Sequence, residues 1–480
     1  MGEWRWKRLS VKVQQLSLTA MERLRAYVVN SRAKDFILLA LPYQVSAVLT
    51  ALVAVGYARL FHWMEDINLD ILAHDPRWIF LTAPLSFLLS WWLVVRLAPL
   101  AGGSGIPQLM AAVEVATEKK NDRSWRFLNL RIILVKIASS MAMVFGGGAI
   151  GREGPTLQIS GSIYRIVHQL LPPFWPKVSR RVMMITGGAA GLGAAFNTPL
   201  GGIVFAVEEL TKTHIAQFRT AVLTAVILSG MTAQWLLGPY LMLGYPQLAP
   251  VTFSFMYKIL AIAAVAGLVG AIFSRTLMLF DKLRRSMPTR GEQALFVLVC
   301  AFLFAGCFHF LGGHSLGSGN ALLREYLFSH TVEPDLANMG ARLLAPLFSF
   351  SAGGAGGIFA PSLAAGAAIG GWMAQWFDLS RGHFNMLVLA GMTAFLSGIT
   401  RSPFTSAILV LEMTDRHSAI FQLMYAAMIG YLIAFTIDRK SYYERMKERL
   451  LKELPEWRTQ AASIPPGDRP MTTDPSARNG

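Results

Sequence analysis

The stretch "TGGAAGLGAAFNTPLGGIVFAVEEL" at residues 186–210 decides the fold, because the chain carries a second copy of it. Residues 390–413, "AGMTAFLSGITRSPFTSAILVLEM", align with the first copy without a gap. The copies share a glycine, a proline and a glutamate at matching positions, namely Gly187 with Gly391, Pro199 with Pro403 and Glu208 with Glu412. An internal copy of this length predicts an architecture built from a structural repeat.

Two further blocks recur in the same order. "GREGP" at 151–155 matches "GIFAP" at 357–361, and Gly-Ser-Gly at 103–105 matches Gly-Ser-Gly at 317–319. The blocks divide the chain into halves of about 35–240 and 250–448. Two acidic residues are not repeated: Glu153 faces Phe359, and Glu209 faces Met413. The repeat alone leaves open whether the halves are inverted, but transporters built this way bind substrate between their halves.

The composition places this repeat in a membrane. Hydrophobic residues make up 54% of the 480 and charged residues 15%, against roughly 45–50% and about 25% in ordinary soluble domains. Long apolar stretches recur at 36–61, 78–100, 132–150, 182–207, 221–242, 258–280, 294–311 and 404–435. Several reach the roughly 20 residues that a spanning helix needs. A large soluble protein with buried helices is disfavoured because few polar faces are visible at helical period. We expect an all-α polytopic membrane protein.

The net charge of +16 could indicate a nucleic-acid binder, but its distribution follows the positive-inside rule. Basic residues gather at 23–34, 119–131, 282–290 and 439–452, whereas "HWMEDINLDILAHDPRW" at 62–78 is acidic. We therefore expect both termini in the cytoplasm, the acidic segment as an outside loop, and no nucleic-acid partner. Residues 1–34 form a cytoplasmic segment and 449–480 a largely disordered tail in this interpretation.

Cofactor and enzyme chemistry find little support. Cys300 and Cys307 lie seven residues apart in one apolar run, which favours packing. The histidines at 168, 214, 309 and 314 have no metal-ligand spacing. Gly146, Gly148 and Gly151 fit G-x-G-x-x-G, yet no β-branched strand precedes them and no acid follows about 20 positions on. We expect no metal, no cofactor and no enzyme activity; a membrane enzyme or nucleotide-binding protein is a third, weaker hypothesis.

Three short motifs, "GSGIP" at 103–107, "GREGP" and "GIFAP", combine glycines with a proline before a run able to form a helix. Proline suits the first turn of a helix and glycine permits tight backbone approach. Each motif therefore predicts a helix that begins inside the membrane, with free N–H groups and a partial positive charge. Several such ends together make an anion site without a full cation, although ordinary kinks are the alternative for any one motif.

At these residues the chain resembles the CLC family of chloride channels and chloride/proton exchangers. The three motifs, "AAFNTPLGGIVFAVEEL" at 194–210 and "LVLEMTD" at 409–415 stand in family order over about 35–445. The resemblance implies two inverted helical repeats whose broken helices meet at a central anion site. It also implies a homodimer in the bilayer with one chloride pathway per subunit, and a prokaryotic member of the bacterial inner membrane without cytoplasmic regulatory domains.

The resemblance also implies the site residues. The anion-binding set is Ser104, Gly105, Ile106, Ile358, Phe359 and a tyrosine near the C-terminal end. "DRKSYYERM" offers Tyr442 and Tyr443, and the spacing after Lys440 favours Tyr443. Many exchangers carry acidic residues where this chain has Gln108 and Met110.

Glu153 matches the gating glutamate of the family and Glu209 the internal proton-transfer glutamate of its exchangers, with Arg152 expected to support Glu153. The two glutamates favour chloride/proton antiport. The alternative is a passive voltage- or pH-gated chloride channel on the same scaffold.

Overall fold

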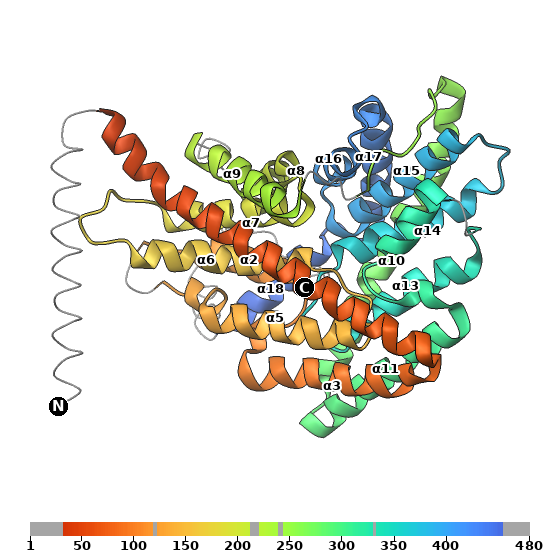
Figure 1. The fold of residues 1–480 in the computed structure, drawn as a ribbon, viewed down its shortest axis with the longest axis horizontal. Helices are drawn as coiled ribbons and strands as arrows, with labels where there is room; N and C mark the ends of the chain where they lie inside the picture. The colour runs from red at the N-terminus through yellow and green to blue at the C-terminus, as the bar shows by residue number, and fades with distance from the viewer. Residues whose placement is uncertain (1–31, 119–121, 212–219, 239–242, 330–332, 455–480) are drawn as a thin grey trace, which may run out of the picture.

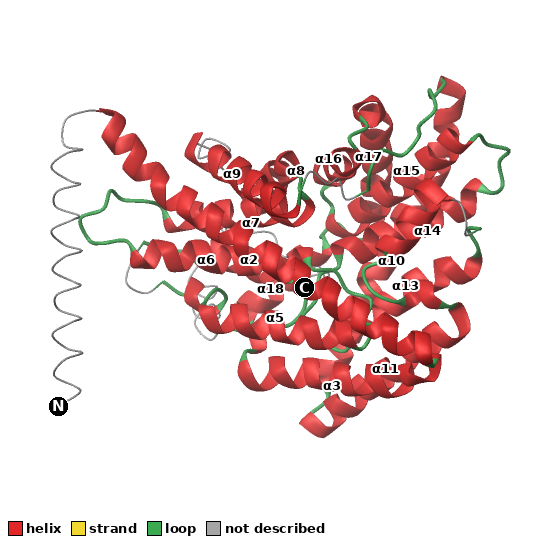
Figure 2. Cartoon of the chain, viewed as in Figure 1, coloured by secondary structure: helices red, strands yellow, loops and turns green. Residues whose placement is uncertain are grey.

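The computed structural model describes residues 32–118, 122–211, 220–238, 243–329 and 333–454. Within these ranges the chain is helical, and the only β-pairing is two isolated bridges (Figure 2). Eight of the described helices are long and apolar enough to cross a membrane. The predicted all-α polytopic architecture is therefore confirmed. His214, residues 1–31 and the tail from 455 lie outside the described residues.

Among the residues that the structure describes, two sets of eight α-helices follow one another (Figure 1). The first set is α2 (Arg32–His74), α3 (Ile79–Leu97), α4 (Ile106–Val115), α5 (Leu130–Phe145), α6 (Glu153–Leu170), α7 (Arg180–Phe196), α8 (Pro199–Phe205) and α9 (Thr220–Leu237). The second is α10 (Met256–Ser286), α11 (Arg290–Leu311), α12 (Asn320–Arg324), α13 (Leu336–Ser351), α14 (Phe359–Ala374), α15 (Arg381–Thr400), α16 (Pro403–Thr414) and α17 (Ile420–Ile437). A last helix, α18 (Tyr442–Lys452), has no counterpart in the first set.

The same helix pairs pack in both sets. α6 packs on α7 as α14 packs on α15, α3 on α5 as α11 on α13, and α2 on α9 as α10 on α17. The repeated glycines explain one of these contacts. A Cβ on Gly187 would lie 3.0 Å from the Gly161 Cα, and a Cβ on Gly391 would collide with the Gly366 carbonyl. Glycine at both positions lets the paired helices cross in close contact.

The two halves cap each other's helices. The Glu412 carboxylate, on α16, accepts hydrogen bonds from Leu200 N (3.1 Å) and Gly201 N (2.8 Å) at the start of α8. The Glu208 carboxylate, which follows α8, accepts them from Phe404 N (3.2 Å) and Thr405 N (2.7 Å) at the start of α16. Reciprocal contacts between equivalent positions are the mark of a two-fold axis. The repeated glutamates thus join repeats related by a pseudo-two-fold axis, as inverted repeats require.

The acidic segment that we expected as an outside loop is helical instead. α2 continues through residues 62–74 and ends at His74. The reason is local: no glycine or proline occurs between Tyr57 and Asp75, so nothing ends the helix before Pro76. Glu65 and Asp66 are therefore held on a rigid helix rather than on a loop.

The two cysteines behave as packing residues. Cys300 and Cys307 are buried on α11 and are not joined by a disulfide. Both belong to the hydrophobic cluster between α3 and α11. This agrees with the packing role expected from their position in an apolar run.

Candidate anion site

Three helices begin at one place in the interior, each at a motif that predicted a helix start. α4 begins at Ile106, α6 at Glu153 and α14 at Phe359. The segments before them are joined by backbone hydrogen bonds. Gly151 and Gly357 bond each other at 2.7 and 2.6 Å, while Gly103 bonds Gly354 at 2.8 Å and Gly356 at 3.2 Å. Because the first N–H groups of a helix have no partner within it, the arrangement collects such donors around one point.

Glycine is required where these segments meet. Gly103 and Gly105 have φ of 67° and 99°, a left-handed backbone that favours glycine. A Cβ on Gly154 would collide with the Ser104 side chain and lie 2.6 Å from the Ser104 carbonyl oxygen. The starts of α4 and α6 can therefore approach each other only with glycine at 154.

Two buried hydroxyls face each other beside these helix starts. The Tyr443 phenol, in the first turn of α18, interacts with Ser104. Nevertheless, neither Ser104 Oγ nor Tyr443 OH has a hydrogen-bond partner among the described residues. Leaving a buried polar group unpaired costs about 1–3 kcal/mol. Two such hydroxyls directed at one place fit a ligand that accepts hydrogen bonds.

The structure also shows which of the two tyrosines, Tyr442 or Tyr443, faces the site. Tyr443 is fully buried and its ring stacks on Phe359, with centroids 6.1 Å apart. Tyr442 instead lines a cavity of about 450 Å³, the Tyr442 pocket, together with Ser104, Arg284, Arg285 and Arg449. Tyr443 is thus the tyrosine that faces Ser104.

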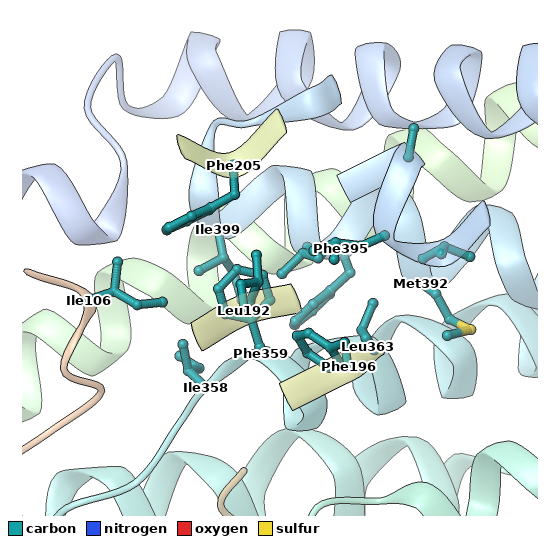
Figure 3. Packing of buried hydrophobic residues seen from close by; sticks show 14 of the residues in the cluster. Ile106, Leu192, Phe196, Phe205, Ile358, Phe359, Leu363, Met392, Phe395 and Ile399 are labelled. Carbon is teal, nitrogen blue, oxygen red and sulfur yellow. The ribbon is translucent and has the colours of Figure 1, made fainter. Parts of the chain in front are cut away.

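Ile358 and Phe359 lie at the start of α14 with buried side chains. Figure 3 shows Ile106 opposite Ile358, and Phe359 between the rings of Phe196 and Phe205. The Phe359 centroid is 6.1 Å from that of Phe196 and 6.3 Å from that of Phe205. Aromatic packing on three sides fixes the first turn of α14, so that its N–H groups keep their direction.

The Glu153 carboxylate lies at the start of α14. It is 1% exposed and lies close to its own N–H and to the N–H of Ala360. Its Oε2 atom is buried without a hydrogen-bond partner among the described residues. A carboxylate therefore takes the helix-start donors that an anion would use.

Arg152, which we expected to support Glu153, interacts electrostatically with the Glu153 carboxylate. The residue is buried, with 8% exposed, and it makes no hydrogen bond or salt bridge to any described residue. It lines a cavity of about 470 Å³, the Arg152 pocket, with residues of α2 and of the segment 313–321.

Glu209 lies within a π-helical turn at Ala206–Thr211. It is 4% exposed, and its Oε2 atom accepts a hydrogen bond of 2.8 Å from Ser402 Oγ. Tyr443 interacts electrostatically with both Glu209 and Glu153. Both unrepeated glutamates thus interact electrostatically with one tyrosine, whereas the adjacent Glu208 caps a helix.

Lys136 is a residue of the site that the sequence interpretation missed. Its fully buried ammonium donates hydrogen bonds of 2.8 Å to the carbonyls of Ala101 and Gly103, before Ser104. The available signal was a lysine in the apolar run "ILVKIASS", because ionisable residues within a membrane helix are usually functional. Gln108 adds to the same support with a hydrogen bond of 2.6 Å to the Gly102 carbonyl, and Met110 is buried in the core.

Metal chemistry is not indicated by the part of the chain that the structure describes. No group of three or more His, Cys, Asp or Glu side chains there is placed to hold a metal ion. The histidine at 168 instead contacts the Val178 carbonyl at 2.9 Å, and that at 314 lies 3.4 Å from Glu325.

Comparison with known proteins places this geometry in a family. The family model described as voltage gated chloride channel matches residues 86–434. The H(+)/Cl(-) exchange transporter ClcA of Citrobacter koseri is 32% identical over 449 residues, covering 88% of this chain and 90% of that protein. The ClcA of Yersinia pestis is 31% identical over 457 residues, covering 89% and 91%.

Solved structures share the fold. A slow cyanobacterial Cl⁻/H⁺ antiporter has a TM-score of 0.73 at 24% identity and covers 88% of this chain and 98% of its own. A CLC-type fluoride/proton antiporter has a TM-score of 0.72 at 19% identity, covering 86% and 98%. The family model matches most of the membrane region, and the chain has an inverted-repeat fold with three helix starts at one point. The chain therefore belongs to the voltage-gated chloride channel family, CLC.

Proposed function

We propose that this protein exchanges chloride for protons across a bacterial inner membrane. The observation that carries the proposal is the position of the Glu153 carboxylate at the start of α14, close to the Ala360 N–H. The relatives in Citrobacter koseri and Yersinia pestis are named H(+)/Cl(-) exchange transporters, which supports exchange over passive conduction.

Chloride binds in this proposal between the Ser104 and Tyr443 hydroxyls and the N–H groups at Ile358 and Phe359. Gly105 and Ile106 form the start of α4 on the opposite side. All these groups are neutral donors, and helix starts add only a partial charge. The ion is therefore held by hydrogen bonds and dipoles, which permit its release more readily than a directly paired cation would.

Glu153 is the gate. Its charged carboxylate and a chloride ion compete for the same N–H groups, so the pathway is closed while the carboxylate stays there. Protonation removes the charge, weakens the hold of the helix start and frees the position for the anion. Binding of a proton and binding of an anion are thereby coupled at one place.

Glu209 supplies the proton from the cytoplasmic side. Its carboxylate accepts a hydrogen bond from Ser402 and interacts electrostatically with Tyr443, as Glu153 also does. In this proposal the proton passes from Glu209 to Glu153 by an internal route of its own. A homodimer with one pathway per subunit, and cytoplasmic termini on both ends, complete the proposed arrangement.

The test is a flux assay on the purified protein in liposomes. A chloride gradient is imposed while a potassium ionophore clamps the membrane potential. Exchange predicts proton movement against the proton gradient, driven by chloride. Chloride movement without any proton movement would instead establish the passive channel, and no chloride movement would overturn both.

A further inference from the structure

The Gly-Ser-Gly loop of the second half copies that of the first in backbone and in support. Gly317 and Gly319 have φ of 57° and 92°, close to the 67° and 99° of their counterparts at 103 and 105. The buried Arg342 guanidinium donates hydrogen bonds to the carbonyls of Leu316 (2.6 Å) and Gly317 (3.1 Å). Arg342 occupies the position in α13 that Lys136 occupies in α5, since both lie the same number of residues after the helix start. Each repeat thus holds one such loop over one buried cation.

The two loops open to different cavities. Ser104 lines the Tyr442 pocket, whereas Gly317, Ser318 and Gly319 line the Arg152 pocket. By the pseudo-two-fold relation, the second loop faces the opposite side of the membrane from the first. In the orientation proposed above, the Arg152 pocket is the outer one.

Arg152 brings a full positive charge to this pocket and interacts electrostatically with the Glu153 carboxylate. The residue is 8% exposed, makes no hydrogen bond or salt bridge to the described residues, and lines the pocket wall. A buried charge is costly unless its polar groups are paired. An anion in the pocket would supply hydrogen-bond acceptors for the guanidinium.

A carboxylate of the chain already lies against the second loop. Glu65 Oε1 is so close to Gly317 that a Cβ there would lie 2.7 Å from it, and Oε2 is 3.0 Å from His62 Nδ1. Glu65 interacts electrostatically with Arg342 and with Glu153. The Glu65 carboxylate thus lies beside the second loop, within the electrostatic reach of Arg342. The other charged side chains at the pocket are Asp66 and Arg324, with the pair of His314 and Glu325 close by.

We propose that the Gly317–Gly319 loop, Arg152 and Arg342 form a second chloride site, on the outer side of the pathway, for which the Glu65 carboxylate competes with the ion. The proposal rests on the proposed anion transport and adds an outer binding step ahead of Glu153. Glu65, carried on the helical continuation of α2, would regulate access to that step.

The experiment is crystallography of the full-length protein in bromide, which replaces chloride and is located by its anomalous signal. We compare the wild type with Glu65→Gln, Arg152→Gln and Asp66→Asn. Asp66→Asn is the matched control, because it removes the same charge from the same pocket at a residue that does not contact the loop. In Glu65→Gln we expect a bromide ion within hydrogen-bond distance of the Arg152 guanidinium and the Ser318 hydroxyl. In Arg152→Gln that ion should be absent.

The outcomes separate this proposal from the proposed function. Bromide between Ser104 and Tyr443 but none in the Arg152 pocket of Glu65→Gln overturns the outer site and leaves chloride transport standing. Equal occupancy of the outer pocket in Asp66→Asn and Glu65→Gln overturns the specific competition by Glu65. Absence of bromide at Ser104 would count against the central site itself.

If a variant does not crystallise, a flux measurement provides a second test of the outer site. Removing one charge several ångströms from an ion near the protein surface changes its affinity by about tenfold. We therefore expect Glu65→Gln to lower the external chloride concentration that half-saturates uptake by about tenfold. Arg152→Lys should retain the dependence of uptake on external chloride, and Ser318→Ala should weaken it. An unchanged external dependence in both Ser318→Ala and Glu65→Gln, in folded protein, overturns the proposal.

Discussion

Gly151 and Gly357 exchange both of their backbone hydrogen bonds, the N–H of each donating to the carbonyl of the other at 2.7 and 2.6 Å. They are equivalent residues of the two repeats, so this pairing lies on the pseudo-two-fold axis of the chain. It fixes the start of α6, with Glu153, against the start of α14, where the Glu153 carboxylate lies close to the Ala360 N–H. Any movement of the gate is consequently a movement of the Glu153 side chain and not of the backbone beneath it.

Replacing Glu153 by alanine should remove proton coupling and leave or raise chloride flux. The carboxylate that competes with chloride for the start of α14 is gone, and no other side chain takes its place. Chloride and proton fluxes in liposomes measure both effects. A variant that is folded but transports no chloride would show that Glu153 has a structural role instead.

Glu209 and Glu208 are adjacent but should respond differently to replacement by glutamine. Glu209→Gln should abolish proton flux and preserve chloride flux, because Glu209 faces Tyr443 and Ser402. Glu208→Gln should keep coupling but lower the free energy of unfolding by about 0.5–2 kcal/mol, as loss of a helix cap does. Fluxes and thermal unfolding in detergent distinguish the two. Proton flux unaffected in Glu209→Gln would exclude it as the internal proton donor.

The two tyrosines offer a matched pair for chloride affinity. Tyr443→Phe removes a buried hydroxyl directed at Ser104, so chloride should bind more weakly by roughly 0.5–1.5 kcal/mol, the contribution of a typical hydrogen bond. Tyr442→Phe should change affinity less, since Tyr442 lines the Tyr442 pocket. Calorimetric titration with chloride measures both. The opposite order would assign the site to Tyr442.

Gly154→Ala should destroy anion binding, because the new Cβ would collide with Ser104. Gly56→Ala on α2 is the control, since a Cβ there has no atom within 4 Å. We expect Gly56→Ala to be as stable as the wild type or more so, as alanine favours helix by about 1 kcal/mol. Chloride titration and thermal unfolding of both variants test this. Normal affinity in Gly154→Ala would mean that α4 and α6 can separate at no cost.

The attachment of α18 should weaken in acid. Burial raises the pKa of the Asp438 carboxyl, but the hydrogen bonds from Arg445 outweigh burial and hold the pKa below its usual value of 3.8. A depressed carboxyl pKa stabilises the fold above the unfolded value, and this stability is lost as the pH falls through the folded value. Unfolding followed between pH 6 and pH 3 should show a smaller acid loss in Asp438→Asn than in the wild type. Equal pH dependence would contradict the ion pair.

The sequence predicted the features that depend on local chemistry. Glycine and proline at 103–107, 151–155 and 357–361 marked the helix starts correctly, because those residues determine the backbone where they stand. Features that depend on distant partners were not predictable. Glu208 and Glu412 look in the sequence like any acidic residue of a helix. The N–H groups that they cap lie about two hundred residues away along the chain. The spacing after Lys440 favoured Tyr443 over Tyr442, but the interaction of Tyr443 with Ser104 joins distant parts of the chain and is visible only in the structure.

The reciprocal caps of α8 and α16 have a consequence for biosynthesis. The N–H groups at the start of α8 donate hydrogen bonds to the Glu412 carboxylate, 212 residues beyond Leu200. While the ribosome is still making the second half, the first half is in the membrane with these groups unpaired, which is costly in lipid. Neither half is therefore complete without the other. The insertion machinery must shield the unpaired N–H groups of the first half from lipid until the second half is present. Two separately expressed halves should accumulate only when they are made together.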